Sequence, residues 1–365
     1  MFLVNGIGWA SWAARLPAIQ ERLAIGEGAV GAALLGATLG LFVSVVVTSV
    51  LVERFGSRMV TIVSGATMIA ALPLIGLAPS FPLLAAALVL YGAANGAFDL
   101  AANSQAVTVE RTYGRPMMSS FHALFSAGAL VGAGIAALVA TNGVPVDLHL
   151  IGIAALLLTL LAVASLALVP HPRHGEVVGV RTSLVGVARP LVGLGVISFC
   201  VLLAEGSVTD WSAIYLSSVV GAGPGVAATG LIVFSLTMML GRLFGDRLTL
   251  RLGPARIVRG GAAVAAAGLA LTLLVPTVAM SLMGFALVGL GLSIIFPVVL
   301  SAAGRVPAVR SATGLAGTTA TGYVGFIAGP PIIGFVAEAS SLRLALGLVL
   351  ACIVVAGLLA SQVER

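Results

Sequence analysis

Three residues that can gain or lose a proton lie inside long apolar runs of this sequence. They are Asp99, Glu205 and His122. A carboxylate desolvated in this way can exchange protons near neutral pH, and histidine titrates near physiological pH. We therefore expect these three residues to carry protons. Two alternatives remain open: Glu205 is a static partner for Arg15, and His122 is a neutral ring bonded to a neighbouring helix.

Asp99 belongs to a polar stripe within its apolar run. Asn95, Asp99 and Asn103 follow one another at intervals of four residues, so they lie on one face of a helix. Three polar groups in one row are what a polar pathway through an apolar layer requires. The alternative is a hydrogen-bonded seam between two helices. We expect the pathway, because an acid in an apolar layer usually has a function.

A second group of side chains suits the binding of a solute. Asn5, Trp9 and Trp12 share one helix face, where their rings can stack on a sugar or another ring-bearing solute; a packing or interfacial role is the alternative. For Asp210 and Trp211 the alternative is a loop carboxylate beside an interfacial tryptophan. The residues that we expect to line a solute cavity are Asn5, Trp9, Trp12, Arg15, Asn95, Asn103, Asp210, Trp211 and Tyr323.

The elements that position these residues must be membrane-spanning helices. Of the 365 residues, 60% are hydrophobic and 8% are charged, whereas a soluble domain keeps about a quarter of its residues charged. Continuous apolar runs exclude the alternating pattern of a β-barrel, so we predict an all-α membrane protein. There is room for about twelve spans of roughly 20 residues. We place the spans at 2–19, 29–52, 59–78, 83–106, 117–139, 149–169, 190–216, 226–245, 257–277, 280–303, 312–336 and 342–361.

The arginines orient these spans. All 18 basic residues are arginines, and they are dispersed between the apolar runs, which is not the pattern of a nucleic-acid-binding protein. The loops after the even-numbered spans, together with the C-terminus, hold fourteen of them. The opposite loops hold only Arg22 and Arg343. Positive charge stays on the cytoplasmic side, so both termini are expected there.

The chain divides into two similar halves. A polar stretch at 171–189 is expected to be a cytoplasmic linker between bundles at 1–170 and 190–365. After the second span come Glu53, Arg54, Gly56 and Arg58, and after the eighth come Gly241, Arg242, Asp246 and Arg247. An acid–arginine pair at the cytoplasmic end of the second helix of each half indicates duplication.

These paired motifs resemble the loop signature of the major facilitator superfamily, roughly Gly-x-x-x-Asp-Arg-x-Gly-x-Arg. The first copy has Ser49 for the glycine and Glu53 for the aspartate, and the second has a longer spacing to Gly253. The resemblance implies twelve transmembrane helices in two pseudo-symmetric six-helix bundles that transport by alternating access. It also implies that the paired loops control gating.

Other stretches are similar to a bacterial inner-membrane subgroup of this family that is itself distantly similar to the fucose permease. Asp99-Leu-Ala-Ala-Asn103 resembles the Glu-Thr-Ala-Ala-Asn of that permease. The remaining similar stretches are 9–17, 204–207 with 210–211, and 321–323 with 329–331. The resemblance therefore implies a multi-pass protein of the bacterial inner membrane.

Four glycine pairs fall in spans two, five, eight and eleven. They are Gly36 and Gly40, Gly128 and Gly132, Gly241 and Gly245, and Gly325 and Gly329. In the family these are the helices at which the two halves meet and rock, and small residues permit that close contact. The resemblance therefore implies that the glycine pairs lie between the halves.

The function that we expect is secondary active transport, as a proton-coupled symporter of a small polar, sugar-like solute. A proton-driven exporter of drugs or amphipathic metabolites and a non-transporting membrane receptor are the alternatives. No nucleotide-binding loop, catalytic triad or metal-ligand cluster is present in the sequence, so we expect neither an enzyme nor a cofactor or metal site. The expected partners are the solute, protons and the lipid bilayer, with the protein as a monomer.

Overall fold

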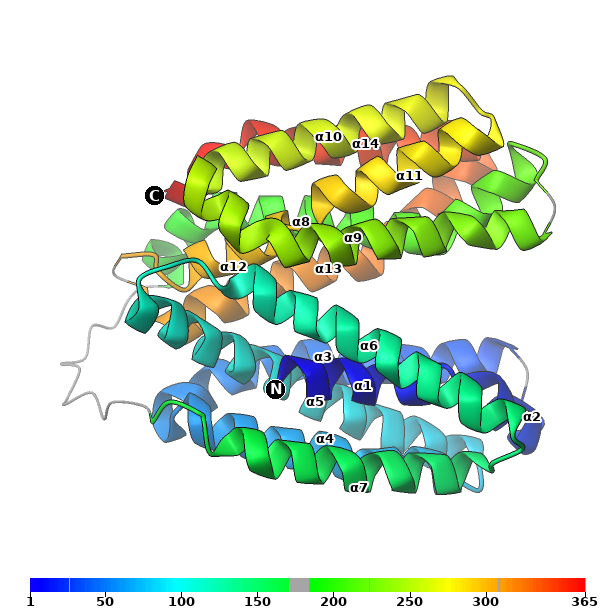
Figure 1. The fold of residues 1–365 in the computed structure, drawn as a ribbon, viewed down its shortest axis with the longest axis vertical. Coiled ribbons are helices and arrows are strands. Elements are labelled where there is room, and N and C mark those ends of the chain that lie inside the picture. The colour runs from blue at the N-terminus through cyan, green and yellow to red at the C-terminus, as the bar shows by residue number, and fades with distance from the viewer. Residues whose placement is uncertain (26, 171–183, 223, 308, 365) are drawn as a thin grey trace. The chain divides into compact units, whose positions relative to one another are not determined.

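Figure 1 shows a computed structural model of the chain. It describes residues 1–25, 27–170, 184–222, 224–307 and 309–364, and among these residues every regular element is a helix. The first seven helices are α1 (Phe2–Ala13), α2 (Leu16–Leu23), α3 (Glu27–Phe55), α4 (Ser57–Leu77), α5 (Phe81–Tyr113), α6 (Met118–Thr141) and α7 (Val146–Ser165). The others are α8 (Leu184–Ser218), α9 (Pro224–Leu252), α10 (Pro254–Leu274), α11 (Val278–Leu292), α12 (Ile295–Ala303), α13 (Ser311–Ala339), α14 (Leu342–Leu358) and the 3-10 helix η1 (Ala360–Glu364).

The helices match the predicted spans to within several residues, and they confirm the all-α class. Among the described residues, nine stretches are long and apolar enough to cross a membrane. Helices α3 and α9 contain 29 residues each. At about 1.5 Å per residue each is longer than the roughly 30 Å hydrocarbon core of a bilayer.

Two predicted spans are each built from two helices. The span 2–19 breaks into α1 and α2 around Ala14 and Arg15, and the span 280–303 breaks into α11 and α12 around Ser293 and Ile294. Each second helix has a proline close to its start, Pro17 and Pro297. Proline has no N–H, so it cannot bond the carbonyl four residues before it, and the helix breaks there. This leaves the carbonyl of Ser293 without a helical partner.

The helix lengths repeat between the two halves. Helices α4 and α10 contain 21 residues each, as α3 and α9 share 29. The second copy of each begins 197 positions after the first (27 and 224, 57 and 254). The residue between the helices is Gly56 in one half, with φ 82°, and Gly253 in the other, with φ 83°. Only glycine adopts this backbone conformation readily, so the same turn is built twice.

The chain separates into two compact units. Unit 1 contains Met1–Thr112 and Leu124–Gly179, and unit 2 contains Tyr113–Ala123 and Val180–Arg365. The first turns of α6 therefore group with unit 2. Most of the linker predicted at 171–189 lies outside the described residues, and α8 begins within it at Leu184. In unit 1 the buried core lies on α1, α4, α5 and α7, with Met68, Leu88, Phe98 and Leu157 near its centre.

The same helix pairs pack together within each unit. In unit 1, α1 packs on α6, α3 on α5 and α4 on α7. In unit 2, α8 packs on α13, α9 on α11 and α10 on α14. These are the same positions in the order of spans, so two pseudo-symmetric bundles follow from one repeated arrangement.

The glycine pairs make these close contacts possible. The prediction that the pairs lie between the halves was wrong for three of them, whose Cβ positions face a helix of the same half; in the fourth pair, Gly245 faces Ser119 of α6, a helix of the first half. Gly36 and Gly40 face α5, and Gly128 and Gly132 face α1. In unit 2, Gly325 and Gly329 face α8, Gly241 faces Ser293, and Gly245 faces Ser119 and Ile294. Each pair meets a helix of its own unit. Small residues here let helix backbones approach closely inside a bundle.

Candidate functional site

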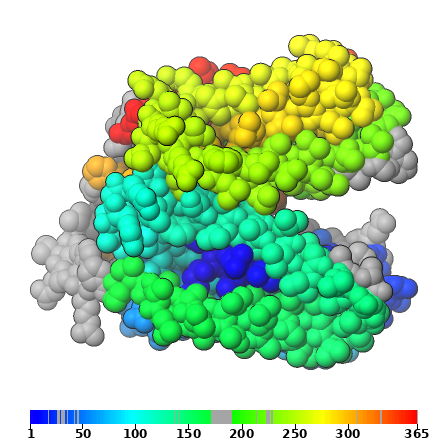
Figure 2. Space-filling view, in the orientation of Figure 1, coloured from blue at the N-terminus to red at the C-terminus, as the bar shows by residue number. Residues whose placement is uncertain are grey.

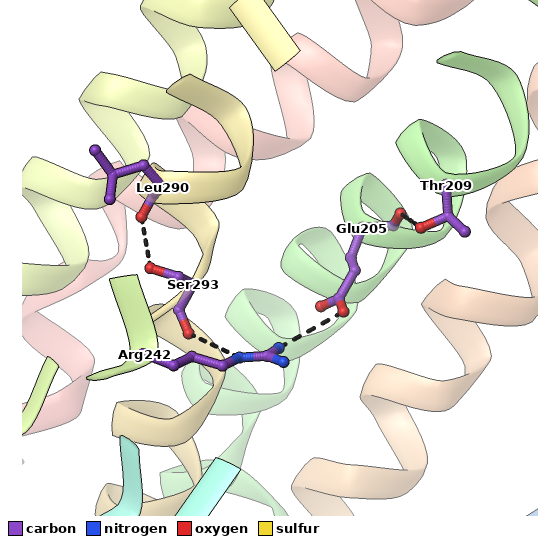
Figure 3. Close-up of polar contacts among 5 residues, drawn as sticks. All are labelled: Glu205, Thr209, Arg242, Leu290 and Ser293. Atoms are coloured by element: carbon purple, nitrogen blue, oxygen red, sulfur yellow. Dashed lines mark hydrogen bonds and ion pairs between the residues drawn. The ribbon is translucent and has the colours of Figure 1, made fainter. Parts of the chain in front are cut away.

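An ion pair lies inside unit 2, between α8 and α9 (Figure 3). Arg242 Nη2 is 3.6 Å from Glu205 Oε1, and the two side chains are 10% and 21% exposed. Glu205 lies well inside α8, in the part of that helix apolar enough to span a membrane. A charge at the centre of a membrane costs about 2.5–3.5 kcal/mol on the insertion scale, and pairing offsets that cost. The pair therefore places two compensated charges within a bundle.

The break between α11 and α12 supplies a further partner for Arg242. Its Nε donates to the carbonyl oxygen of Ser293 at 3.4 Å, the carbonyl that Pro297 leaves free of a helical bond. The side chain of Ser293 donates to Leu290 O at 2.6 Å. A Cβ on Gly241 would overlap the Ser293 side chain. A proline on one helix and a glycine on the other thus bring the arginine and the free carbonyl together.

Asp246 lies one turn after Arg242 on α9 and binds the start of α6. Its Oδ1 accepts from the backbone N–H of Ser119 at 2.8 Å, and its Oδ2 accepts from that of Ser120 at 2.7 Å. The Ser119 hydroxyl donates to Arg242 O at 2.8 Å. The first N–H groups of a helix have no partner in the helix, and a carboxylate there also meets the positive end of the helix dipole. Asp246 therefore caps α6 from another helix.

His122 lies one turn further along α6. Its side chain is buried, and its ring meets Phe296 of α12 edge-on, with centroids 5.9 Å apart. Unit 2 thus gathers three of the predicted residues, Glu205, Arg242 and His122, with Asp246 one turn away.

In unit 1 the predicted stripe lies along α5. Asn103 is buried and its Nδ2 donates to the backbone oxygen of Asp99 at 2.9 Å. Asp99 and Asn95 are half-buried. Asn95 Oδ1 is buried with no hydrogen-bond partner in the described part of the chain. A buried polar atom of this kind requires water or a ligand.

Helix α1 and the break after it hold three more predicted residues, all buried: Asn5, Trp12 and Arg15. Arg15 Nη2 donates to Val144 O at 2.8 Å. Its Nε and Nη1, like Asn5 Oδ1 and Trp12 Nε1, have no hydrogen-bond partner within the described ranges. Trp9 differs, since 47% of it is exposed. These unpartnered groups make the α1 side of unit 1 suitable for a polar ligand.

Glu205 does not occupy the position in the second half that corresponds to Arg15 in the first. The 197-position repeat places Ser212 at the position of Arg15. Glu205 has its partner, Arg242, inside unit 2.

The equivalence of the two loop motifs was also wrong. The shared glycine turn aligns Gly56 with Gly253, so Leu250 corresponds to Glu53 and Ser49 corresponds to Asp246. Glu53 and Arg54 are exposed at the end of α3, and Arg58 is half-buried on α4. Asp246 lies inside α9 and caps α6, whereas Arg247 is exposed. The two acids therefore occupy different places.

The remaining predicted cavity residues lie on α8 and α13. Asp210 is exposed, and Trp211 and Tyr323 are half-buried. Trp211 lies beside Gly334 of α13, and its Nε1 has no hydrogen-bond partner in the part that the structure describes. Sequence reasoning missed Ser293 and the capping role of Ser119 and Ser120. The proline four residues after Ser293 was a signal for the first, because it frees that carbonyl.

The Glu205–Arg242 ion pair and the 197-position repeat are both consistent with a duplicated membrane transporter. Similarity to known families shows which family the chain belongs to. A model described as Major Facilitator Superfamily matches residues 1–322. The chain belongs to this superfamily. An uncharacterised MFS-type transporter of Yersinia pestis is 35% identical over 351 residues, which is 95% of this chain and 90% of that protein. The membrane protein MosC of Rhizobium meliloti is 32% identical over 96% of this chain and 87% of its own length.

Solved structures show the same fold. The fucose:proton symporter of E. coli superposes with a TM-score of 0.85 at 16% identity, over 100% of this chain and 97% of that one. The human organic anion transporter MFSD10 gives a TM-score of 0.80 at 14% identity, over 98% of this chain and 96% of that one. The superfamily member described here is therefore a multi-pass membrane transporter of a small solute, and family and fold point away from an enzyme.

Proposed function

We propose that this transporter is a proton-coupled symporter of a small polar, sugar-like solute in the bacterial inner membrane, working as a monomer. The observation that carries the proposal is the Glu205–Arg242 pair inside unit 2. Ionisable groups kept inside membrane bundles generally serve ion or substrate movement. The fold shared with the fucose:proton symporter of E. coli adds support.

Asp99 is the residue that we assign to proton transfer. It lies in the polar stripe of α5, beside an asparagine oxygen that has no partner among the described residues. Glu205 is the rival for this role, but an arginine already compensates its charge. Removing one partner of a buried pair leaves the other charge uncompensated. We therefore assign Glu205 and Arg242 to the coupling between solute binding and helix movement.

His122 and Asp246 are assigned to the conformational cycle. Asp246 holds the start of α6 against α9 through two charge-assisted hydrogen bonds. Such a contact stabilises one state of a transport cycle, and its loss shifts the populations of the states. His122, one turn further on, shares this contact region and can relay protons within it.

A first experiment identifies the solute. Thermal shifts of the purified protein against sugars, nucleosides, amino acids, drugs and organic anions reveal binding, because a ligand stabilises the state that it binds. Organic anions belong in the screen because Arg15 has two donor atoms without a partner in the described ranges. We expect a sugar or similar polyol to give the largest shift. A drug giving it would favour the exporter instead.

The second experiment tests the assigned roles in proteoliposomes. Asp99→Asn is expected to keep solute exchange between equal pools but to lose accumulation driven by a pH gradient. The carrier can reorient with an uncharged amide at this position, but the amide binds no proton. Glu205→Gln is expected to weaken solute binding or to stop both reactions. If the Asp99→Asn variant still concentrates solute on an imposed pH gradient, Asp99 is not the proton carrier and Glu205 is assigned that role.

A further inference from the structure

A groove of about 720 Å³ lies on unit 2 along α9, α10 and α11. Helix α11 packs against both α9 and α10, and all three reach the face of unit 2 drawn in Figure 2. The groove walls include Leu240, Phe244, Leu248, Val264 and Leu290. Each of these side chains is exposed, from 37% for Val264 to 54% for Phe244. Exposed apolar side chains of this kind are suited to contact with lipid acyl chains.

The groove is deep because glycines, which have no side chain, form part of its floor. A Cβ on Gly261 would collide with the carbonyl oxygen of Gly291, so α10 and α11 touch backbone to backbone. The neighbouring Gly260 also lines the groove, and no described atom lies within 4 Å of where its Cβ would be. The space that a side chain would fill at Gly260 therefore stays open to an apolar chain.

Three arginines line one end of this groove. Arg247 and Arg251 lie one turn apart on α9, and Arg256 follows the Gly253 turn at the start of α10. None of the three makes a hydrogen bond or ion pair in the described part of the chain. Other arginines do, for example Arg305 with Ser301 and Arg242 with Glu205. Three arginines beside an apolar groove, none of them in an ion pair within the described residues, form a site for an amphipathic anion.

We propose that this groove binds an anionic phospholipid of the cytoplasmic leaflet. Its phosphodiester meets Arg247, Arg251 and Arg256, and an acyl chain lies over Gly260 between Phe244 and Val264. The positive-inside rule places this arginine-rich end on the cytoplasmic side, where lipid phosphates lie. Each arginine near a membrane surface contributes about fivefold in affinity for an anionic lipid. The proposal concerns lipid binding alone, so it does not depend on the proposed transport reaction.

The contribution of the arginine charges to lipid binding is tested on the full chain purified in neutral detergent. Native mass spectrometry with added phosphatidylglycerol, against phosphatidylethanolamine of the same acyl chains, measures lipid affinity. We expect the parent to prefer phosphatidylglycerol and Arg256→Gln to lower that affinity about fivefold. Arg259→Gln is the matched control, since Arg259 is exposed on the same helix but lies outside the groove. Equal affinity for the two lipids, or equal losses in the two variants, overturns the proposal.

The channel for the acyl chain has its own test. Gly260→Leu fills the groove and leaves all three arginines in place, so we expect phosphatidylglycerol binding to fall severalfold. Gly347→Leu on α14 is its control, because the Cβ position of Gly347 is also open among the described atoms. Inorganic phosphate at matched concentration is expected to leave the bound lipid in place. Gly260→Leu binding like the parent, or displacement by phosphate alone, contradicts a lipid site.

Discussion

In unit 2 the charge of Arg242 is balanced by groups from two neighbouring helical segments. Arg242 is compensated by the Glu205 carboxylate and by a carbonyl that a proline releases. Each partner alone would be a costly group to bury in a bundle. The pair therefore behaves as one unit, and its members are expected to couple energetically.

We predict that Glu205→Leu and Arg242→Met each destabilise the protein by about 2 kcal/mol, because each leaves one charge uncompensated. The double variant is expected to be more stable than the sum of the two single effects implies, since apolar groups replace both charges. Thermal unfolding in one detergent measures all four proteins. Strictly additive losses would show that the two side chains do not interact.

The Asp246 contact predicts a local effect on α6. Asp246→Ala removes the acceptor for the backbone N–H groups of Ser119 and Ser120. Loss of such a cap at a helix start lowers the free energy of unfolding by about 1–2 kcal/mol. Hydrogen exchange at the start of α6 is expected to become faster by about tenfold. Asp210→Ala, which removes an exposed carboxylate of α8, is the control. Unchanged protection in Asp246→Ala rules out the capping role.

Whole helices pack through glycine surfaces that the sequence pattern marks. The interpretation of those surfaces as contacts between halves was wrong for three of the four glycine pairs and holds for Gly245, which faces Ser119. A glycine pattern shows that backbones approach each other, but not which backbones. The breaks at Arg15 and Ser293 were not predicted, although Pro17 and Pro297 were visible in the sequence. Apolar runs continue across both breaks, and hydropathy alone therefore reads each as one helix.

Gly128 and Gly134 give a matched test on α6. A Cβ on Gly128 would collide with Leu3 O of α1, whereas the Cβ position of Gly134 is open among the described atoms. Gly128→Val is expected to destabilise the protein by about 1–3 kcal/mol through overpacking, and Gly134→Val by much less. Thermal unfolding of both variants decides. Equal effects would show that α1 and α6 are not in close contact.

At the scale of the whole molecule, composition was enough to predict the class and the number of spans, since lipid leaves few alternatives to helices. The repeat was predicted too, but its register was not. Glu53 and Asp246 look alike in sequence, and only the glycine turns at Gly56 and Gly253 show that they occupy different positions. The partner of Glu205 could not be predicted, because it comes from a separate helix.

Orientation remains a prediction that arginine placement supports. Reporters fused after Arg58, within 171–189 and at Arg365 are expected to read cytoplasmic. Reporters at Pro79 or Gly223 are expected to read external. Paired alkaline phosphatase and fluorescent protein fusions measure both sides. An external reading from the 171–189 fusion would contradict two bundles of equal span number.

Proton movement coupled to the solute tests the central claim most directly. Proteoliposomes in weakly buffered medium receive the solute identified by thermal shift, and a pH electrode follows the outside. The account predicts that the external medium becomes more alkaline as protons enter with the solute, and that Asp99→Asn abolishes this change while solute exchange continues. Solute entry into parental proteoliposomes with no change of external pH would contradict proton-coupled symport.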